Sequence, residues 1–469
     1  MTTGRLVWGL GRLAVAVYYR VERVGHPLPD GPVLVVANHP NGLLDPPMIV
    51  ATAGRTPRFL AKSTLFPMPL VGWFVRGAGA IPVYRRVDVG AGADASRNTG
   101  MFAAVRRALA DGEPVCLFPE GTTHSRGTID PLKTGAARIA LSAASEGIPV
   151  RIVAVGLNFD RKAELRSSAT IAYGHPFSPA PFVERFAADA HDAVSALTAE
   201  IASRLRDLVI EVEPVREAEL VHALDRIYTA ARHGGSDAAS SLARRQRLAE
   251  RLLPALRRDR PEAYDALIGT LARYRRRLAR FGVADRMVGE DVPRGAATRF
   301  AVRETFWLAA LAPLLTAGFA AFFVPYQSIK WLARALPIDL EEQATWKVIG
   351  GGLLYPLWMA AIGVTVAARA GATWGWAAGL AGPLLAVATL WAWEREVAVL
   401  ETVRSYLALQ RLSSRAARAL ARHQEAIASL LDELSANSQD TGDSAPSGGG
   451  SGSPAGTEGA VPATPRSDA

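Results

Sequence analysis

A chain of 469 residues is longer than one hydrophobic core normally organises, so two or three structural units are expected. The formal net charge of +9 comes mostly from arginine and suits phosphate-bearing partners: nucleic acid, an anionic membrane surface or a phosphorylated substrate. The single cysteine, Cys116, excludes an intramolecular disulfide, and the apolar run around it predicts a buried core position.

Residues 1–27 are expected to carry an amphipathic helix. At helical period one face gathers four apolar residues: Leu6, Leu10, Leu13 and Val17. Beside this stripe lie three aromatic residues: Trp8, Tyr18 and Tyr19. The pattern fits two arrangements. The helix lies in a membrane interface with its aromatic rings docked on the headgroup layer, or it packs on the protein's own sheet.

Between residues 28 and 212 short β-rich runs alternate with helical ones. The expected strands are 33–36, 79–83, 115–118, 151–157 and 170–173. The expected helices are 98–110, 134–146 and, closing the domain, 187–210. The first two helices end at glycines, where a left-handed C-terminal cap is expected. This alternation predicts an α/β domain with a largely buried sheet.

Residues 213–303 are predicted to form a basic helical region. Its arginines include Arg244, Arg245, Arg247, Arg251, Arg257, Arg258, Arg273, Arg275, Arg276, Arg277 and Arg280. A solvated helical face is one interpretation. Because an apolar region follows at once, the sequence favours a juxtamembrane surface that contacts anionic lipid on the cytoplasmic side. DNA binding is the weaker alternative, because no helix-turn-helix, zinc or RNA-binding signature accompanies the charge.

Residues 304–394 hold three apolar stretches, at 306–324, 348–368 and 374–393. Each is near the roughly 20 residues that a helix needs to cross a bilayer, and tryptophans cluster near their ends, so transmembrane helices are predicted. The short turn between the last two stretches predicts a helical hairpin. Buried helices of a soluble protein are the alternative.

The topology of these stretches stays open. Basic residues precede the first stretch and follow the last, so three full crossings would put them on opposite sides of the membrane. Either the first stretch is re-entrant or interfacial, or the positive-inside rule is violated. Residues 395–434 are predicted to form a long amphipathic helix, and the polar tail 435–469 is not expected to fold.

Four short patches stand in fixed order in the α/β segment. They read Asn-His-Pro-Asn-Gly-Leu-Leu-Asp at 38–45, Gly-Ala-Ile-Pro-Val-Tyr-Arg at 79–85, Phe-Pro-Glu-Gly-Thr at 118–122 and Ile-Pro-Val-Arg-Ile-Val-Ala-Val at 148–155. Together with Lys-Thr-Gly-Ala-Ala at 133–137, they make the chain resemble the glycerolipid acyltransferase family over about residues 28–180. That family includes lysophosphatidate and glycerol-3-phosphate acyltransferases. The resemblance implies transfer of a fatty acyl group to a hydroxyl of a phosphorylated glycerolipid precursor.

Acyl transfer from a thioester to an alcohol requires a base, because a neutral hydroxyl is a poor nucleophile. His39 follows an expected strand, and Asp45 is near enough to fix its tautomer and stabilise the imidazolium. No serine or cysteine motif indicates a covalent acyl-enzyme. The family usually leaves four residues between the histidine and the aspartate, whereas here Pro40 to Leu44 make five. The extra residue has to bulge before the next helix begins if the pair is to meet.

The resemblance also implies which residues bind the acceptor. Arg85 is expected to hold its phosphate, with Arg86 as a competitor and a surface salt bridge as the alternative role. Glu120 and Gly121 match the acceptor-binding pair of the family, the glutamate contacting a glycerol hydroxyl or ordering the loop.

The third patch departs from the family after Thr122, which we also expect to bind the acceptor. Arginine often comes next in the family, whereas this chain continues Thr-His-Ser-Arg. Arg126 is expected to supply the missing charge and Lys133 a second one, while His124 is interpreted as a loop residue that helps to line the site.

No residue spacing indicates a zinc or calcium site, and no cofactor is expected. The sequence therefore predicts a membrane-bound O-acyltransferase that takes its acyl group from acyl-CoA or acyl-carrier-protein. The first choice of acceptor is 1-acylglycerol-3-phosphate, and glycerol-3-phosphate or dihydroxyacetone phosphate is the second. The catalytic domain is expected on the cytoplasmic side. A rival of another class is a lipid-binding or scaffolding protein that lost the chemistry through the altered loop.

Overall fold

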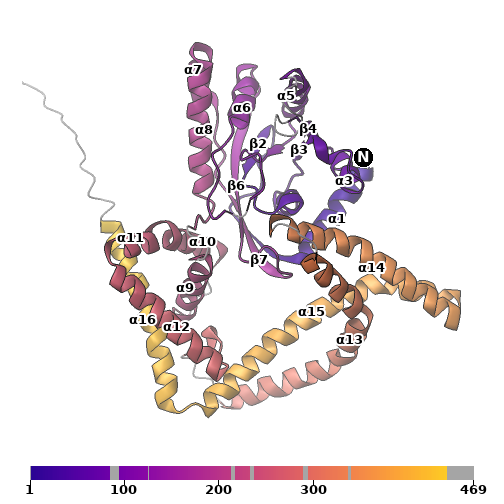
Figure 1. The fold of residues 1–469 in the computed structure, drawn as a ribbon, viewed down its shortest axis with the longest axis vertical. Helices are drawn as coiled ribbons and strands as arrows, with labels where there is room; N and C mark the ends of the chain where they lie inside the picture. The colour runs from indigo at the N-terminus through magenta and orange to yellow at the C-terminus, as the bar shows by residue number, and fades with distance from the viewer. Residues whose placement is uncertain are drawn as a thin grey trace, which may run out of the picture.

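The computed structural model describes residues 2–84, 95–124, 126–212, 217–232, 237–288, 294–335 and 340–440. An α/β domain comes first, a helical region with its own core follows, and long apolar helices extend from the α/β domain (Figure 1). The predicted fold class, an α/β domain followed by a helical region and apolar helices, is therefore confirmed.

The α/β domain is built on one mixed sheet in the order β1-β7-β6-β2-β5-β3-β4. The strands are β1 (Tyr19–Val24), β2 (Val33–Ala37), β3 (Arg58–Lys62), β4 (Ile81–Val83), β5 (Val115–Leu117), β6 (Arg151–Phe159) and β7 (Ser167–Tyr173). The β6–β7 pair is antiparallel, and the other neighbouring strands are parallel. The five predicted strands are present with small shifts at their ends. Two strands were not predicted: β1, whose charged and apolar residues alternate at a sheet edge, and the short β3.

Helices cover both faces of this sheet. Leu34 and Val36 of β2 point into a core shared with the helices on one face, while Val33 and Val35 point to the opposite face. The helices of the domain are α1 (Thr2–Tyr18), α2 (Asp45–Thr52), α3 (Val71–Gly77), α5 (Ala95–Ala110), α6 (Gly135–Ser145), α7 (Val183–Ala188) and α8 (Ala190–Arg206). Because both faces are covered, the strand ends are the parts of the sheet open to a ligand.

Helix α1 packs on the domain with its aromatic face. The rings of Trp8 and Phe59 lie 5.5 Å apart, and Trp8, Tyr18 and Tyr19 are all buried in one core cluster. Of the two arrangements considered for these aromatic side chains, the structure has the second: they fill the space between α1 and the sheet. The apolar stripe of Leu6, Leu10 and Leu13 stays exposed on the other side.

The helical region has a separate hydrophobic core. It contains α9 (Ala218–Ala231), α10 (Ala238–Arg247), α11 (Leu253–Asp259), α12 (Pro261–Phe281) and the C-terminal α16 (Ser414–Asp440). The single helix predicted for residues 395–434 is wrong. Residues up to Arg411 continue α15, Leu412 is extended, and α16 starts afresh with the Ser413 hydroxyl accepting the Ala416 N–H.

Within the described part of the chain, three helices are long and apolar enough to cross a bilayer: α13 (Arg294–Ala335), α14 (Leu340–Ala370) and α15 (Ala372–Arg411). Helices α14 and α15 form the predicted hairpin, which turns at Gly371. They pack closely, because a side-chain carbon at Gly363 would lie 3.1 Å from the carbonyl oxygen of Gly375.

Helix α13 contains Pro313 and Pro325 and bends along its length (Figure 1). Its first part contacts the domain end of the hairpin through an ion pair between Glu304 and Arg395. Further along, Trp358 of α14 donates a hydrogen bond of 2.6 Å to the Ala321 carbonyl. Helix α13 therefore contacts both arms of the hairpin, α15 near the domain end and α14 further along.

Candidate active site

The candidate catalytic loop leaves the carboxyl end of β2, in the middle of the sheet. Asn38 fixes its start, because the side-chain amide donates to the Leu157 carbonyl at 3.1 Å and accepts the Leu157 N–H at 2.7 Å. Asn38 is buried, so this pair of hydrogen bonds binds the loop firmly to β6. This role of Asn38 was not predicted from the sequence.

The structure brings His39 and Asp45 together. His39 Nδ1 lies 2.8 Å from Asp45 Oδ2, which also accepts the Asn41 backbone N–H at 2.8 Å. An ionised carboxylate only accepts hydrogen bonds, so Nδ1 carries the hydrogen and the lone pair is left on Nε2. Burial raises the pKa of the Asp45 carboxyl, and the hydrogen bonds from His39 and Asn41 oppose that rise.

The five residues between His39 and Asp45 are accommodated by a short 3-10 turn, η1 (Gly42–Leu44). Gly42 has a φ of 55°, a left-handed conformation that glycine adopts at no steric cost. The turn ends where α2 begins, so Asp45 stands in the first turn of that helix, whose N-terminal dipole favours a carboxylate.

The imidazole plane of His39 is fixed by the ring of Phe118. The two rings are stacked, with centroids 4.0 Å apart and planes 11° apart. Cys116, two residues earlier on β5, is fully buried, and burial raises the pKa of its thiol. Its predicted core position is confirmed, and a buried thiol with a raised pKa is a poor nucleophile.

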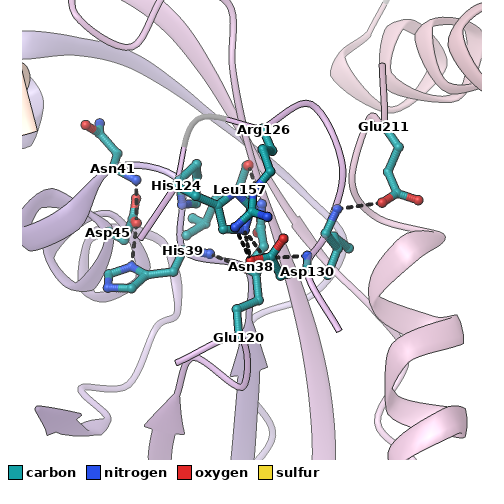
Figure 2. A network of polar contacts seen from close by, with 12 residues as sticks. Asn38, His39, Asn41, Asp45, Glu120, His124, Arg126, Asp130, Leu157 and Glu211 are labelled. Carbon is teal, nitrogen blue, oxygen red and sulfur yellow. Dashed lines mark hydrogen bonds and ion pairs between the residues drawn. The ribbon is translucent and has the colours of Figure 1, made fainter. Parts of the chain in front are cut away.

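Glu120 organises the third patch (Figure 2). Its buried carboxylate accepts the backbone N–H of His39 at 2.9 Å and that of Asp130 at 2.9 Å. It also lies 2.6 Å from His124 Nε2, while His124 Nδ1 is buried without a partner among the described residues. Of the two roles considered for Glu120, this geometry favours ordering the loop over touching a glycerol hydroxyl.

The remaining residues of the third patch lie around this carboxylate. Gly121 has a φ of 75°, and a side-chain carbon there would lie 2.3 Å from Lys133 Nζ. Lys133 therefore lies directly over the glycine. Thr122 is exposed, and the exposed Arg126 forms a 2.5 Å ion pair with Asp130. Arg126 thus already has a carboxylate partner, which partly neutralises its charge.

The expected phosphate ligand Arg85, and its competitor Arg86, lie outside the described residues. The residue before them is fixed, because Asn98 of α5 accepts the Tyr84 N–H at 3.1 Å and donates to the Tyr84 carbonyl at 2.8 Å. Lys62 ends β3 and pairs in register with Val83 of β4, so a lysine that the sequence analysis missed stands beside this strand end.

Two further side chains, Tyr19 and Lys162, hold the candidate catalytic loop in place, and neither was predicted to do so from the sequence. Tyr19 accepts a 2.7 Å hydrogen bond from the Asn41 side chain, and Lys162 Nζ donates to the Pro40 carbonyl at 2.8 Å. The Tyr19 hydroxyl in turn donates to the Lys162 carbonyl. Burial raises the pKa of Tyr19, which keeps this hydroxyl neutral and able to donate.

A cavity of about 480 Å³ lies away from His39, between α8 and the helical region. Its lining has three acids, Asp207, Glu211 and Glu250, against one base, Arg206, and burial raises the pKa of Glu250 to about 7. An acidic cavity is a poor fit for a phosphorylated substrate. Among the described residues no group of three metal-ligating side chains is found.

Comparison with known families shows what the α/β domain is similar to. A family model described as acyltransferase matches residues 20–157, which include the catalytic loop and the third patch. Residues 20–157 are therefore similar to the acyltransferase family.

Relatives that match this part of the chain include enzymes of both expected kinds. A 1-acyl-sn-glycerol-3-phosphate acyltransferase of Chlamydomonas reinhardtii is 28% identical over 171 residues, 35% of this chain and 49% of that protein. A chloroplastic 1-acyl-sn-glycerol-3-phosphate acyltransferase of Brassica napus is 28% identical over 31% of this chain and 40% of its own length. Glycerol-3-phosphate O-acyltransferase 1 of Saccharomyces cerevisiae is 29% identical over 26% of this chain and 16% of its own length. The predicted resemblance to glycerolipid acyltransferases is confirmed.

The match is confined to part of each protein. This chain spans half or less of the length of the curated relatives that it matches. Among solved structures, the 1-acyl-sn-glycerophosphate acyltransferase PlsC of Thermotoga maritima aligns with 43% of this chain and 76% of its own, at 22% identity and a TM-score of 0.31.

Proposed function

We propose that the protein transfers a fatty acyl group from acyl-CoA or acyl-carrier-protein to the free hydroxyl of 1-acylglycerol-3-phosphate. The observation that carries this proposal is the 2.8 Å contact between His39 and Asp45, at the end of a central strand of the domain that matches the acyltransferase family. A histidine oriented by a carboxylate is the arrangement that general-base catalysis at neutral pH requires.

In the proposed mechanism His39 Nε2 accepts the proton of the acceptor hydroxyl while its oxygen attacks the thioester carbonyl. The C–O bond forms, the tetrahedral intermediate collapses, the C–S bond breaks, and the imidazolium returns its proton to the leaving thiolate. Asp45 stabilises the imidazolium. Backbone N–H groups near the third patch would hold the oxyanion, and Gly121 is not one of them because its N–H donates to the Phe118 carbonyl.

The acceptor phosphate is proposed to bind to Arg85, with Lys133 nearby and Arg126, Glu120, Gly121 and Thr122 forming the loop around it. Relatives named for 1-acylglycerol-3-phosphate and relatives named for glycerol-3-phosphate both support this class of acceptor. Glycerol-3-phosphate, or dihydroxyacetone phosphate, is the second candidate.

The catalytic domain is proposed to lie on the cytoplasmic side, because both proposed donors, acyl-CoA and acyl-carrier-protein, are dissolved in the cytoplasm. The open end of the α14–α15 hairpin contacts this domain through Lys347, whose Nζ donates to the Ala163 carbonyl at 2.7 Å, and through Glu394, which pairs with Arg166. We propose that the hairpin enters the membrane and returns, and that α13 is the re-entrant or interfacial segment.

Two experiments test the function. Membranes carrying the protein would be offered both glycerol-3-phosphate and its 1-acyl derivative, and the products would be identified by lipid mass spectrometry. Absence of acylated product would favour a lipid-binding or scaffolding protein.

His39→Ala should remain folded and membrane-bound yet lose roughly a hundredfold or more in turnover. Asp45→Asn keeps the shape and should also lose turnover strongly. Near-normal turnover in a folded His39→Ala would overturn the mechanism.

A further inference from the structure

The arginines of the helical region divide into two groups. Several that the sequence placed together are held in structural ion pairs: Arg244 and Arg245 with Asp225, Arg257 with Glu217 and Arg258 with Asp259. The second half of α12 differs. Arg273, Arg276, Arg277 and Arg280 are exposed there, and none of them has a carboxylate partner among the described residues; Arg273 donates to the hydroxyl of Thr270 on its own helix.

These four side chains form one stripe. Their spacing of three and four residues puts them on a single face of α12, away from the face where Leu271 and Leu278 are buried in the core. The sequence from residue 266 to residue 284 holds no aspartate or glutamate. The stripe is therefore not neutralised by its own helix.

A second stripe lies on the neighbouring α16. Arg415, Arg418 and Arg422 are exposed at helical spacing, opposite the buried Leu420 and Ile427, and residues 402–424 hold no acidic residue. Helices α12 and α16 pack together. The two arginine-bearing halves lie at the same end of the helical region, because Gln424 of α16 donates to the carbonyl of Asp285, just beyond α12.

This end of the helical region is attached to α15 directly after its apolar segment. The turn after α12 is fixed to α15 by Arg286, which donates to Thr402 at 3.0 Å, and by Ser405, which accepts the Ala284 N–H at 2.9 Å. Residues 398–405 of α15 follow Trp393, the end of the apolar stretch, by about 8–18 Å of helix. That distance is comparable with a headgroup layer of about 5–8 Å plus one Debye length of about 8 Å.

We propose that the two arginine stripes of α12 and α16 form a binding surface for anionic phospholipid headgroups, beside the membrane and on the same side as the catalytic domain. Guanidinium groups match phosphate geometry and carry charge at every physiological pH. The surface lies outside residues 20–157, so the proposal does not depend on acyl transfer. Double-stranded nucleic acid is the other polyanion that such charge attracts, and the test includes it.

The test uses the purified full chain in a mild neutral detergent, mixed with equal amounts of phosphatidylglycerol and phosphatidylcholine. The bound lipids are quantified by native mass spectrometry. We expect enrichment of phosphatidylglycerol, and a loss of that enrichment of about fivefold for each arginine replaced in Arg276→Gln/Arg277→Gln. A matched control is Arg107→Gln/Arg138→Gln, which removes two exposed arginines from α5 and α6 of the catalytic domain and should leave the enrichment unchanged.

Two further measurements test the proposal even if Arg276→Gln/Arg277→Gln unfolds. Arg276→Lys/Arg277→Lys keeps the charge and should keep most of the enrichment. In the unmodified protein the enrichment should fall steeply as salt is added, because headgroup attraction is screened. Enrichment that is insensitive to salt, or equal in the stripe and control variants, would overturn the proposal. So would tight binding of a short DNA duplex, at physiological salt, by a protein that shows no preference between the two lipids.

Discussion

The ion pair between Arg166 and Glu394 joins the apolar hairpin to the α/β domain, and its contribution to stability can be predicted. The guanidinium forms two hydrogen bonds with the carboxylate, of 2.6 and 2.7 Å, and the side chains are 22% and 20% exposed. Arg166 has a φ of 62°, a left-handed conformation that costs a non-glycine residue about 1–3 kcal/mol. Such a conformation persists only where the surroundings hold it.

The magnitude follows from the geometry. Opposite charges about 4 Å apart attract by about 4 kcal/mol at an effective dielectric constant of about 20, and desolvation of the two groups removes part of that. We expect a coupling energy of about 1–3 kcal/mol between Arg166 and Glu394. Arg20 also contacts Glu394, at 3.1 Å, but it is 58% exposed and should contribute less than about 1 kcal/mol.

The assay is a double-mutant cycle with Arg166→Gln and Glu394→Gln in the full chain. The free energy of unfolding would be measured by titration with sodium dodecyl sulfate in mixed micelles. A matched control is the cycle for Arg161 and Glu164, a 2.9 Å pair with both side chains more than half exposed, where at most about 0.5 kcal/mol is expected. A coupling energy for Arg166 and Glu394 no larger than that of the control would refute the reasoning.

Three other predictions concern the acceptor and the membrane. Arg85→Lys keeps the charge but loses the bidentate fork, so the apparent KM for the phosphorylated acceptor should rise more than that for the thioester; equal effects would count against the role. High-salt and alkaline washing should leave the full chain in the membrane pellet, and its release by alkali would exclude integral insertion. The topology can be tested with single cysteines introduced into a Cys116→Ala background and an impermeant maleimide added on the side of the catalytic domain. A cysteine at position 369, at the tip of the hairpin, should be shielded from the reagent, whereas a cysteine at position 330 should react. Reaction at both positions or at neither would contradict the proposed topology.

The sequence predicted the parts of this protein that local pattern determines. Hydrophobic periodicity predicts buried strands such as 151–157, and cap residues predict helices that end at glycine. Both kinds of element were found within a few residues of their predicted limits. The sequence left two places open for the aromatic residues of α1, because helical period gives which residues share a face but not which face the sheet covers.

Only the residues that belong to a local sequence motif could be predicted as part of the candidate site. The catalytic loop and the third patch could be found from residue order, but the hydrogen bond from the His39 backbone to Glu120 joins residues 81 positions apart. The supports Tyr19 and Lys162 were missed for the same reason. They belong to an unpredicted edge strand and to the β6–β7 connection, and only tertiary packing brings them to the loop.

The extra residue between His39 and Asp45 has a structural use that bears on the rival scaffold hypothesis. It is accommodated in η1, and η1 is what the start of α14 contacts: Leu44, Ala344 and Val348 belong to one hydrophobic cluster. The longer loop and the C-terminal hairpin therefore fit each other, which argues that the loop is adapted to the hairpin rather than degraded.

This interpretation predicts the effect of restoring the usual spacing. Deleting Gly42 would remove the left-handed residue of η1 and turn Leu44 away from α14 by about 100°. We expect a loss of about 2 kcal/mol in the free energy of unfolding, the value of one buried leucine, together with lower turnover. Gly42→Ala, which keeps the length but strains the turn at a φ of 55°, is the control and should lose about 1 kcal/mol. A shortened loop with unchanged stability and higher turnover would show instead that the extra residue is a defect in the catalytic loop.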